Sequence, residues 1–418
     1  MNIYFSGIGG VGIGPLAEIA HDVGYSIQGS DAKGSPMTQA LCARGLNINI
    51  NQDGSFLQAC YQSKPIDLFV YTSSLAKDHP ELILAKKLGI KTAKRDELLN
   101  LIIDENNLKL IAVSGTHGKT TTTGMLIWTL KQLKIPVSYS IGTTISFGPS
   151  GQFNPDSQYF IYECDEFDRN FLHFKPYLSL VSSIGYDHFD TYPTEQAYLE
   201  AFRQFAKQSH QVIAWKDQHQ EIFRDLTQVN LLEPATIDDS LLLAGHHNRR
   251  NATLVKTALE WLSFSGNLSG ILVQFPGTSR RFEELADNLY TDYAHHPTEI
   301  AATIQLAREL SDHVVVVYQP HQNIRQFKLQ SQYSDCFNGA EVLYWLPTYL
   351  TREDPSLPVL TPEQLTANLI ADIEVHLAEL DDNLWHVIQT ARKSSKLVLC
   401  LGAGTIDSWL REKLTLNS

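Results

Sequence analysis

Apolar runs bounded by glycine alternate with helical patterns along almost all of the 418 residues. This alternation is typical of βαβ units and a mostly parallel sheet. The clearest strand-like runs are NIYFSGIGG, DLFVYTSS, LKLIAVSG, residues 159–164, 179–184 and 211–215, VVVVY, EVLYW and KLVLCLG. Helical patterns cover residues 14–23, 80–88 and 119–133, and residues 245–262 are predicted to form a loop followed by an amphipathic helix.

The pattern breaks at two points, which divide the chain into three blocks. The polar run DENN ends the first block near residue 104, and the proline and glycine of PGTSRRF precede the third. A chain of this length also exceeds what one hydrophobic core usually supports. We therefore predict an α/β protein with domains over 1–104, 105–276 and 277–418, each built on a mostly parallel sheet.

Composition and charge narrow the class of protein. The net charge of −13 argues against broad binding to nucleic acid or to an anionic membrane, because both need clustered positive charge. No apolar run approaches the roughly 20 residues that span a bilayer, and the first residues lack a basic leader, so we expect a cytoplasmic protein. Five scattered cysteines without CxxC spacing suggest neither disulfides nor a zinc site, and we interpret them as structural.

The segment SGTHGKT lies between a predicted strand and a predicted helix. Glycines in such a turn let backbone N–H groups point at phosphate oxygens, and Lys119 would neutralise the β and γ phosphates. The hydroxyl of Thr120 or Thr121 could reach Mg²⁺. Val113 stands where a strict Walker A motif has glycine, so the loop is a variant; a plain glycine turn with a solvated lysine is the alternative.

A second glycine-rich loop, GIGGVG, follows the first predicted strand and opens a helix. Asp31 ends the second predicted strand, where an acid could meet a ribose. This pattern fits NAD(P), a nucleotide-sugar diphosphate or a purely structural turn.

Acids gather at the ends of two further strands, in YECDEFD and in YDHFD. If these strands lie parallel beside the phosphate loop, their carboxyl ends share one crevice. Glu163 and His188 are then plausible Mg²⁺ ligands opposite Lys119. Acids that cap helices and a histidine that packs in the core are the alternative.

Later motifs are weaker on their own. Asn248 and Asn251 lie three apart at a helix start, where they could hold a purine or cap the helix. Arg281 carries a planar fork suited to a phosphoryl group, although a solvated arginine is the usual reading. His321 and Arg325 follow the strand VVVVY, where an amino-acid carboxylate could bind.

Taken together, the motifs GIGGVG, SGTHGKTTTT, ECDEFD, GYDHFDTY, GHHNRRN, SRRF, DYAHHPTE and QPH occur in the order found in Mur ligases, and the resemblance covers residues 3 to about 412. It implies an N-terminal Rossmann-like UDP-binding domain, a central P-loop-type ATPase domain and a C-terminal Rossmann-like domain for the amino acid. It also implies ATP and Mg²⁺, and ligation of L-alanine to the lactyl carboxylate of UDP-N-acetylmuramate through an acyl phosphate. We expect a monomer or a weak dimer.

The resemblance implies a role for each matching residue. Lys119, Glu163, His188 and Arg281 are the expected catalytic groups, and Thr120, Glu163 and His188 the metal ligands. The other implied contacts are Gly115, Thr116, His117, Gly118, Thr121, Asn248, Asn251 and Asp292 for ATP; Gly9, Gly10, Gly12, Ser30, Asp31, Ser73 and Ser74 for the UDP-sugar; and Tyr293, His295, His321 and Arg325 for the amino acid.

One departure from the family pattern bears on specificity. Where the branch that adds L-alanine usually reads PHRYTR, this chain reads PHQNIR, so Gln322 replaces an arginine. Loss of a guanidinium from a carboxylate clamp would weaken amino-acid binding or alter its choice. Arg203 and Lys207 are the nearest cations to match the modified lysine that some members place near a second metal.

Three other functions stay open from the sequence. A ligase of the same family could use glycine, serine or a murein peptide as the amine. The loop GIGGVG alone would suit an NAD(P)-dependent oxidoreductase, and the Gln322 substitution would suit a non-catalytic nucleotide-binding regulator.

Overall fold

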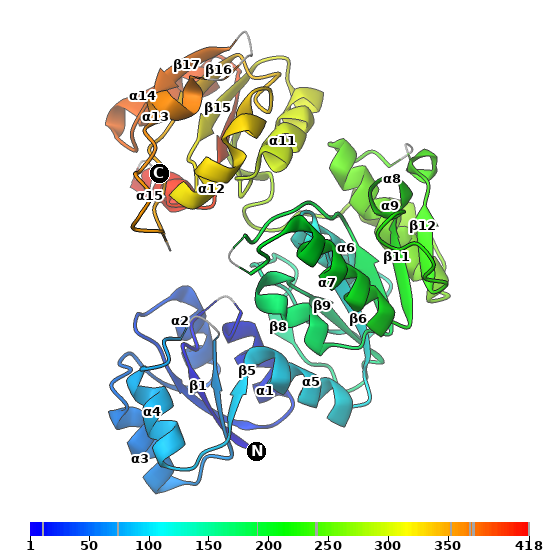
Figure 1. The fold of residues 1–418 in the computed structure, drawn as a ribbon, viewed down its shortest axis with the longest axis vertical. Coiled ribbons are helices and arrows are strands. Elements are labelled where there is room, and N and C mark those ends of the chain that lie inside the picture. The colour runs from blue at the N-terminus through cyan, green and yellow to red at the C-terminus, as the bar shows by residue number, and fades with distance from the viewer. Residues whose placement is uncertain are drawn as a thin grey trace. The chain divides into compact units, whose positions relative to one another are not determined.

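The computed structural model describes residues 1–10, 12–72, 75–189, 191–238, 241–351, 353–367, 369 and 373–416. These residues form three sheets, which Figure 1 shows together with their helices. The chain divides into two compact units, one of Met1–Asp238 with Asn251–Pro276 and one of Asp239–Arg250 with Gly277–Ser418. Within the described residues, no helix is long and apolar enough to cross a membrane.

The first sheet has five parallel strands in the order β3 (Asn47–Asn49), β2 (Ser26–Ser30), β1 (Asn2–Ser6), β4 (Leu68–Tyr71), β5 (Thr92–Lys94). Its helices are α1 (Gly14–Asp22), α2 (Pro36–Ala43), α3 (Ser55–Ser63), α4 (Pro80–Lys87) and α5 (Arg95–Glu105). Side chains alternate between the two faces of β1. Ile3 and Phe5 join the core that contains residues of α1 and α5, whereas Tyr4 packs with residues of α3 and α4. The sheet is therefore covered on both faces.

The central sheet has seven strands in the order β12 (Val229–Leu232), β11 (Gln211–Trp215), β10 (Leu178–Val181), β6 (Lys109–Ser114), β9 (Tyr159–Glu163), β7 (Ser138–Ser140), β8 (Gly151–Gln152). All neighbours are parallel except β7 and β8. Its longer helices are α6 (Lys119–Gln132), α7 (Glu195–Gln208) and α9 (His246–Trp261), with α8 (Lys216–His219) and α10 (Leu268–Val273) as short ones. One hydrophobic core includes Phe5 of the first sheet and Phe160 of the central sheet, which explains why both sheets belong to one unit.

The third sheet, in the second unit, has six strands in the order β13 (Glu283–Ala286), β14 (Leu289–Asp292), β18 (Leu397–Leu401), β15 (Val314–Tyr318), β16 (Val342–Trp345), β17 (Glu374–Leu377). Only the pair β13 and β14 is antiparallel. Its helices are α11 (Pro297–Leu310), α12 (Asn323–Leu329), α13 (Pro362–Thr366), α14 (Asp382–Lys393) and α15 (Ile406–Leu416).

The predicted α/β class with mostly parallel sheets is confirmed. Two local predictions differ from the structure: the strand predicted over 179–184 ends at Val181, and the short hairpin of β7 and β8 was not foreseen. The domain ranges 1–104, 105–276 and 277–418 contain one sheet each and stay a prediction. All five cysteines are free, and Cys42 alone among them is exposed.

Candidate active site

The phosphate loop connects β6 to α6, and its two glycines have backbone angles that other residues rarely adopt. Gly115 has φ +135° and Gly118 has φ +86°. A Cβ at Gly115 would lie 2.5 Å from the Ser182 hydroxyl, so the loop also needs glycine for space. Val113 is fully buried within β6, so the loop begins after it, and this explains why a glycine is absent there. The His117 amide donates to the Ser183 hydroxyl at 2.9 Å.

Lys119 is held across this loop by hydrogen bonds. Its ammonium donates to the carbonyls of Gly115 and Thr116 and to the Glu166 carboxylate, the last at 2.9 Å. Burial alone would lower the pKa of Lys119, but the negative charge of Glu166 raises it overall. Lys119 therefore stays protonated beside the loop amides, as a group that neutralises phosphate must. Thr121 follows in the first turn of α6.

The register of the central sheet brings the acids to the same edge. Glu163, the last residue of β9, pairs with Val113 of β6, and its carboxylate accepts from the Thr120 hydroxyl at 2.6 Å and from the Gly142 amide at 2.8 Å. Threonine and glutamate thus meet at the start of α6, which is the arrangement of donors that suits a hard divalent cation.

A second acidic cluster lies next to Lys119. Ligand atoms of Asp165, Glu166 and His188 all lie within 4.8 Å of one another. Burial would raise the pKa of Glu166, but Lys119 and His188 lower it to about 2. The pKa of His188 is lowered by burial yet raised overall by its contact with Glu166 at 3.5 Å. The sequence paired Glu163 with His188, whereas the structure places Glu163 with Thr120 and His188 with Glu166.

Tyr198 completes this site, although no motif in the sequence singles it out. It belongs to α7 and is fully buried; its hydroxyl lies 2.7 Å from the Thr116 hydroxyl and 3.2 Å from the Glu166 carboxylate. Thr116 also donates to the Gly185 carbonyl at 2.8 Å. Only the fold shows that Tyr198 contacts the phosphate loop.

The expected UDP-sugar residues lie at the carboxyl edge of the first sheet. Gly9 donates its amide to Asp31 at 2.7 Å, so this acid closes the loop instead of pointing a free carboxylate outward. The Ser30 hydroxyl donates to the buried Glu81 at 2.7 Å. Gly10 donates its amide to the Gly7 carbonyl. Two further predicted residues, Ser73 and Ser74, lie outside the described part of the chain.

The two asparagines of α9 differ in their surroundings. Asn251 is buried beside the phosphate loop, since a Cβ at Gly118 would lie 2.9 Å from its side-chain oxygen. The Asn248 amide donates to the Ala244 carbonyl at 3.0 Å, a contact that also fits a helix start. Arg203 donates to the carbonyls of Ile222 and Arg224, and Lys207 is exposed, so neither cation joins the acidic cluster.

In the second unit, Asp292 ends β14 and accepts the amides of Phe282 and Ala294, both at 2.7 Å. Burial raises its pKa to about 6 even though Arg281 opposes the shift. The Arg281 guanidinium lies over the Tyr293 ring, 5.2 Å from its centre. These three predicted residues therefore lie together.

The predicted amino-acid residues continue from that group. The His295 and His321 rings are 5.6 Å apart, and an Arg325 nitrogen lies 3.3 Å from the His321 ring nitrogen. Tyr349, which the sequence did not single out, stacks on His321 with ring centres 5.7 Å apart. Gln322 adopts φ +63° and donates its amide to the Tyr349 carbonyl.

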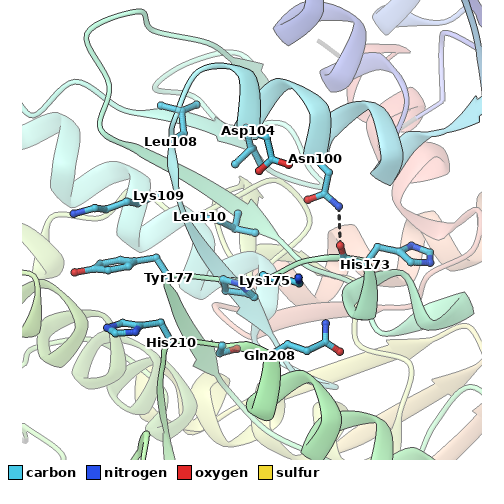
Figure 2. A pocket seen from close by; sticks show the side chains of 13 residues that line it. Asn100, Asp104, Leu108, Lys109, Leu110, His173, Lys175, Tyr177, Gln208 and His210 are labelled. Carbon is cyan, nitrogen blue, oxygen red and sulfur yellow. Dashed lines mark hydrogen bonds between the residues drawn. The ribbon is translucent and has the colours of Figure 1, made fainter.

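A separate cavity of about 650 Å³ lies at the opposite, amino ends of β6, β10 and β11. Figure 2 shows its lining, which includes none of the predicted site residues. Tyr177 stacks on His210 with ring centres 5.3 Å apart, and the Lys109 ammonium lies over the Tyr177 ring. Helices α5 and α7 end beside this cavity, and the carboxyl end of a helix carries partial negative charge. Lys109 and Lys175 in the lining offset that charge, so their presence is explained without a ligand.

Two protein-family models and several proteins of known function match this chain. The model of the Mur ligase family catalytic domain matches residues 2–106, and that of the Mur ligase middle domain matches residues 113–237. The chain is 31% identical to UDP-N-acetylmuramate–L-alanine ligase of Carboxydothermus hydrogenoformans, over 97% of this chain and 94% of that protein. The identity to the enzyme of the same name from a Nocardioides species is 30%, with the same two coverages.

Solved structures show the same fold over the whole chain. UDP-N-acetylmuramate-alanine ligase from Thermotoga maritima matches with a TM-score of 0.77 at 22% identity, covering 100% of both chains. A murein peptide ligase from Psychrobacter arcticus matches with a TM-score of 0.66 at 22% identity, covering 99% of this chain and 98% of that one. Because two domain models and relatives of nearly full length agree, the chain belongs to the Mur ligase family.

Proposed function

We propose that the protein is an ATP-dependent ligase that joins L-alanine to the lactyl carboxylate of UDP-N-acetylmuramate during peptidoglycan synthesis. Relatives that bear this activity in their names align over 97% of the chain. Membership of the Mur ligase family also argues against the oxidoreductase that the loop GIGGVG left open.

One observation carries the proposal: beside the phosphate loop, Lys119 donates to Glu166 and Thr120 donates to Glu163. Lys119 remains charged next to the loop, which suits the β and γ phosphates of ATP. Thr120 and Glu163 offer oxygen ligands, and Mg²⁺ bound there would neutralise charge on the transferred phosphoryl group. The phosphate-loop amides and Lys119 together orient that group.

The chemistry then needs little covalent help from the protein. The lactyl carboxylate attacks the γ phosphorus of ATP, and ADP leaves. The resulting acyl phosphate is attacked by the amine of the amino acid, and inorganic phosphate leaves from the tetrahedral intermediate. Positioning and charge neutralisation provide most of the acceleration in phosphoryl transfers of this kind.

The second unit provides groups suited to the other substrates. We propose that Asp292 accepts a ribose hydroxyl of ATP and that Arg281 contacts its phosphates. His321 and Arg325 offer donors for the amino-acid carboxylate, 3.3 Å apart, and Tyr293 and His295 lie next to them. Gln322 stands where a further cation was expected, so the identity of the amino acid needs a direct test.

That test is phosphate release from ATP and Mg²⁺ with UDP-N-acetylmuramate and each of the twenty amino acids in turn. We expect L-alanine to stimulate release, and we expect Lys119→Ala to abolish it. Stimulation by glycine or serine instead would keep the ligase mechanism and change the specificity. If no amino acid stimulates release, the muramate assignment is wrong.

A further inference from the structure

Arg95, the first residue of α5, lies directly against the glycine-rich loop of the first sheet. A Cβ at Gly12 would lie 2.4 Å from a terminal nitrogen of the Arg95 guanidinium and 3.5 Å from its central carbon. Any side chain at position 12 would therefore displace the arginine. The loop and the guanidinium can approach this closely only because residue 12 is glycine.

Among the described residues, the guanidinium of Arg95 has no hydrogen-bond partner. It is partly buried, yet it forms no hydrogen bond and no ion pair within 4.0 Å with any residue of the described ranges. Its neighbour Lys94 differs, because the Lys94 ammonium pairs with Asp168 at 3.3 Å. No nitrogen of Arg95 is among the fully buried polar atoms without a partner, so the guanidinium stays open to solvent and to an anion. A planar guanidinium with several N–H donors is well suited to bind phosphate oxygens.

Helix α5, which begins at Arg95, packs against the segment Phe167–His173 that follows the acids after β9. Tyr162 and Asp165 raise the pKa of Arg95, against the opposing effect of burial. Arg95 therefore contacts the glycine-rich loop and belongs to a helix that also contacts the segment after β9. The same loop leads into α1, whose amino end attracts negative charge.

We propose that Arg95 binds the diphosphate of the sugar nucleotide at the point where the glycine-rich loop meets the central sheet. This inference rests on the proposed function, since it takes UDP-N-acetylmuramate as the ligand. A planar fork of N–H donors matches phosphate oxygens, and glycine at position 12 lets the diphosphate approach the backbone as well. Arg95 thereby positions the sugar nucleotide relative to the acidic segment beside the ATP loop.

The test is binding of two probes to the full chain and to Arg95→Gln. UDP-N-acetylmuramate carries both the diphosphate and the lactyl carboxylate, whereas UDP-N-acetylglucosamine carries the same uridine diphosphate but no lactyl carboxylate. We expect Arg95→Gln to weaken binding of both probes by about tenfold or more, and Arg95→Lys to restore part of the loss. The KM for UDP-N-acetylmuramate should rise, while the KM for ATP changes less than about twofold, a split that a general loss of stability would not produce.

Lys94→Gln is the matched control, because it removes a neighbouring positive charge whose partner is already Asp168. It should bind both probes like the wild type. Unchanged binding of both probes by Arg95→Gln would overturn the proposal, and weakening of UDP-N-acetylmuramate alone would move the contact from the diphosphate to the carboxylate. Failure of the wild type to bind UDP-N-acetylmuramate would instead overturn the proposed function itself.

Discussion

The hydroxyl of Tyr198 in α7 lies 2.7 Å from the hydroxyl of Thr116 in the phosphate loop. The same hydroxyl lies 3.2 Å from Glu166, which in turn holds Lys119. One buried side chain therefore connects the loop that would bind phosphate with the acid that fixes the lysine. Because three groups of the site share this contact, its loss should lower the catalytic rate more than the stability of the fold.

We expect Tyr198→Phe to lower the rate of phosphate release about tenfold, because Thr116 and Glu166 lose a common partner. The melting temperature should fall by only a few degrees, since one buried hydrogen bond contributes about 1 kcal/mol. Tyr139→Phe is the control: Tyr139 is also fully buried, and its hydroxyl accepts at 2.9 Å from Lys131, which lies near the opposite end of α6 from the phosphate loop. Equal loss of rate in both variants would argue against a specific role for Tyr198.

The phosphate loop and the acids could be located from sequence because both depend on local patterns. Glycines in a strand-to-helix turn and acids at the end of an apolar run can be recognised in the local sequence. Parallel strands then bring their carboxyl ends to the same edge of the sheet. Tyr198 and Tyr349 could not be found in this way. Each reaches the site through a packing contact between distant segments, and nothing in the neighbouring sequence encodes its partner.

The sequence also could not show which acid of this segment contacts which residue of the phosphate loop and α6. The spacing in ECDEFD does not tell which carboxylate faces Thr120 and which faces Lys119. The hydrogen bonds answer this, because Glu163 accepts from Thr120 and Glu166 accepts from Lys119. For Asp31 the fold adds a contact that the sequence does not show, because one oxygen of its carboxylate accepts the loop amide of Gly9. A contact of Asp31 with the sugar nucleotide stays a prediction.

The contact between Glu163 and Thr120 leads to a prediction about the metal. Glu163→Gln should raise the Mg²⁺ concentration needed for half-maximal activity by about tenfold, because a charged oxygen ligand is lost. Asp165→Asn should have a smaller effect on that concentration. The measurement is activity over a Mg²⁺ titration at saturating ATP. A larger effect from Asp165→Asn would place the metal in the cluster of Asp165, Glu166 and His188 instead.

Gln322 gives a prediction about the amino acid. Gln322→Arg should lower the KM for L-alanine several-fold, because a guanidinium would be added beside His321 and Arg325. The backbone at residue 322 has φ +63°, but glutamine and arginine bear the same strain there, so the exchange should leave folding unaffected. Gln322→Ala serves as the control for loss of the side chain. If the KM for L-alanine is unchanged in Gln322→Arg, position 322 does not face the carboxylate.

The pKa of Asp292, raised to about 6 by burial, predicts how stability varies with pH. Between its ordinary value near 3.8 and this raised value, the folded chain holds a proton on Asp292 that the unfolded chain has lost. The folded state therefore binds more protons in this window, and the contribution of Asp292 to stability falls as pH rises through it, by at most about 3 kcal/mol.

Asp292→Asn has no such titration, although it loses one acceptor for the amides of Phe282 and Ala294. Thermal unfolding of both proteins without nucleotide between pH 4.5 and 7.5 checks this: the variant should gain stability relative to the wild type as pH rises. Parallel curves would mean that Asp292 ionises in the folded chain as it does in the unfolded one.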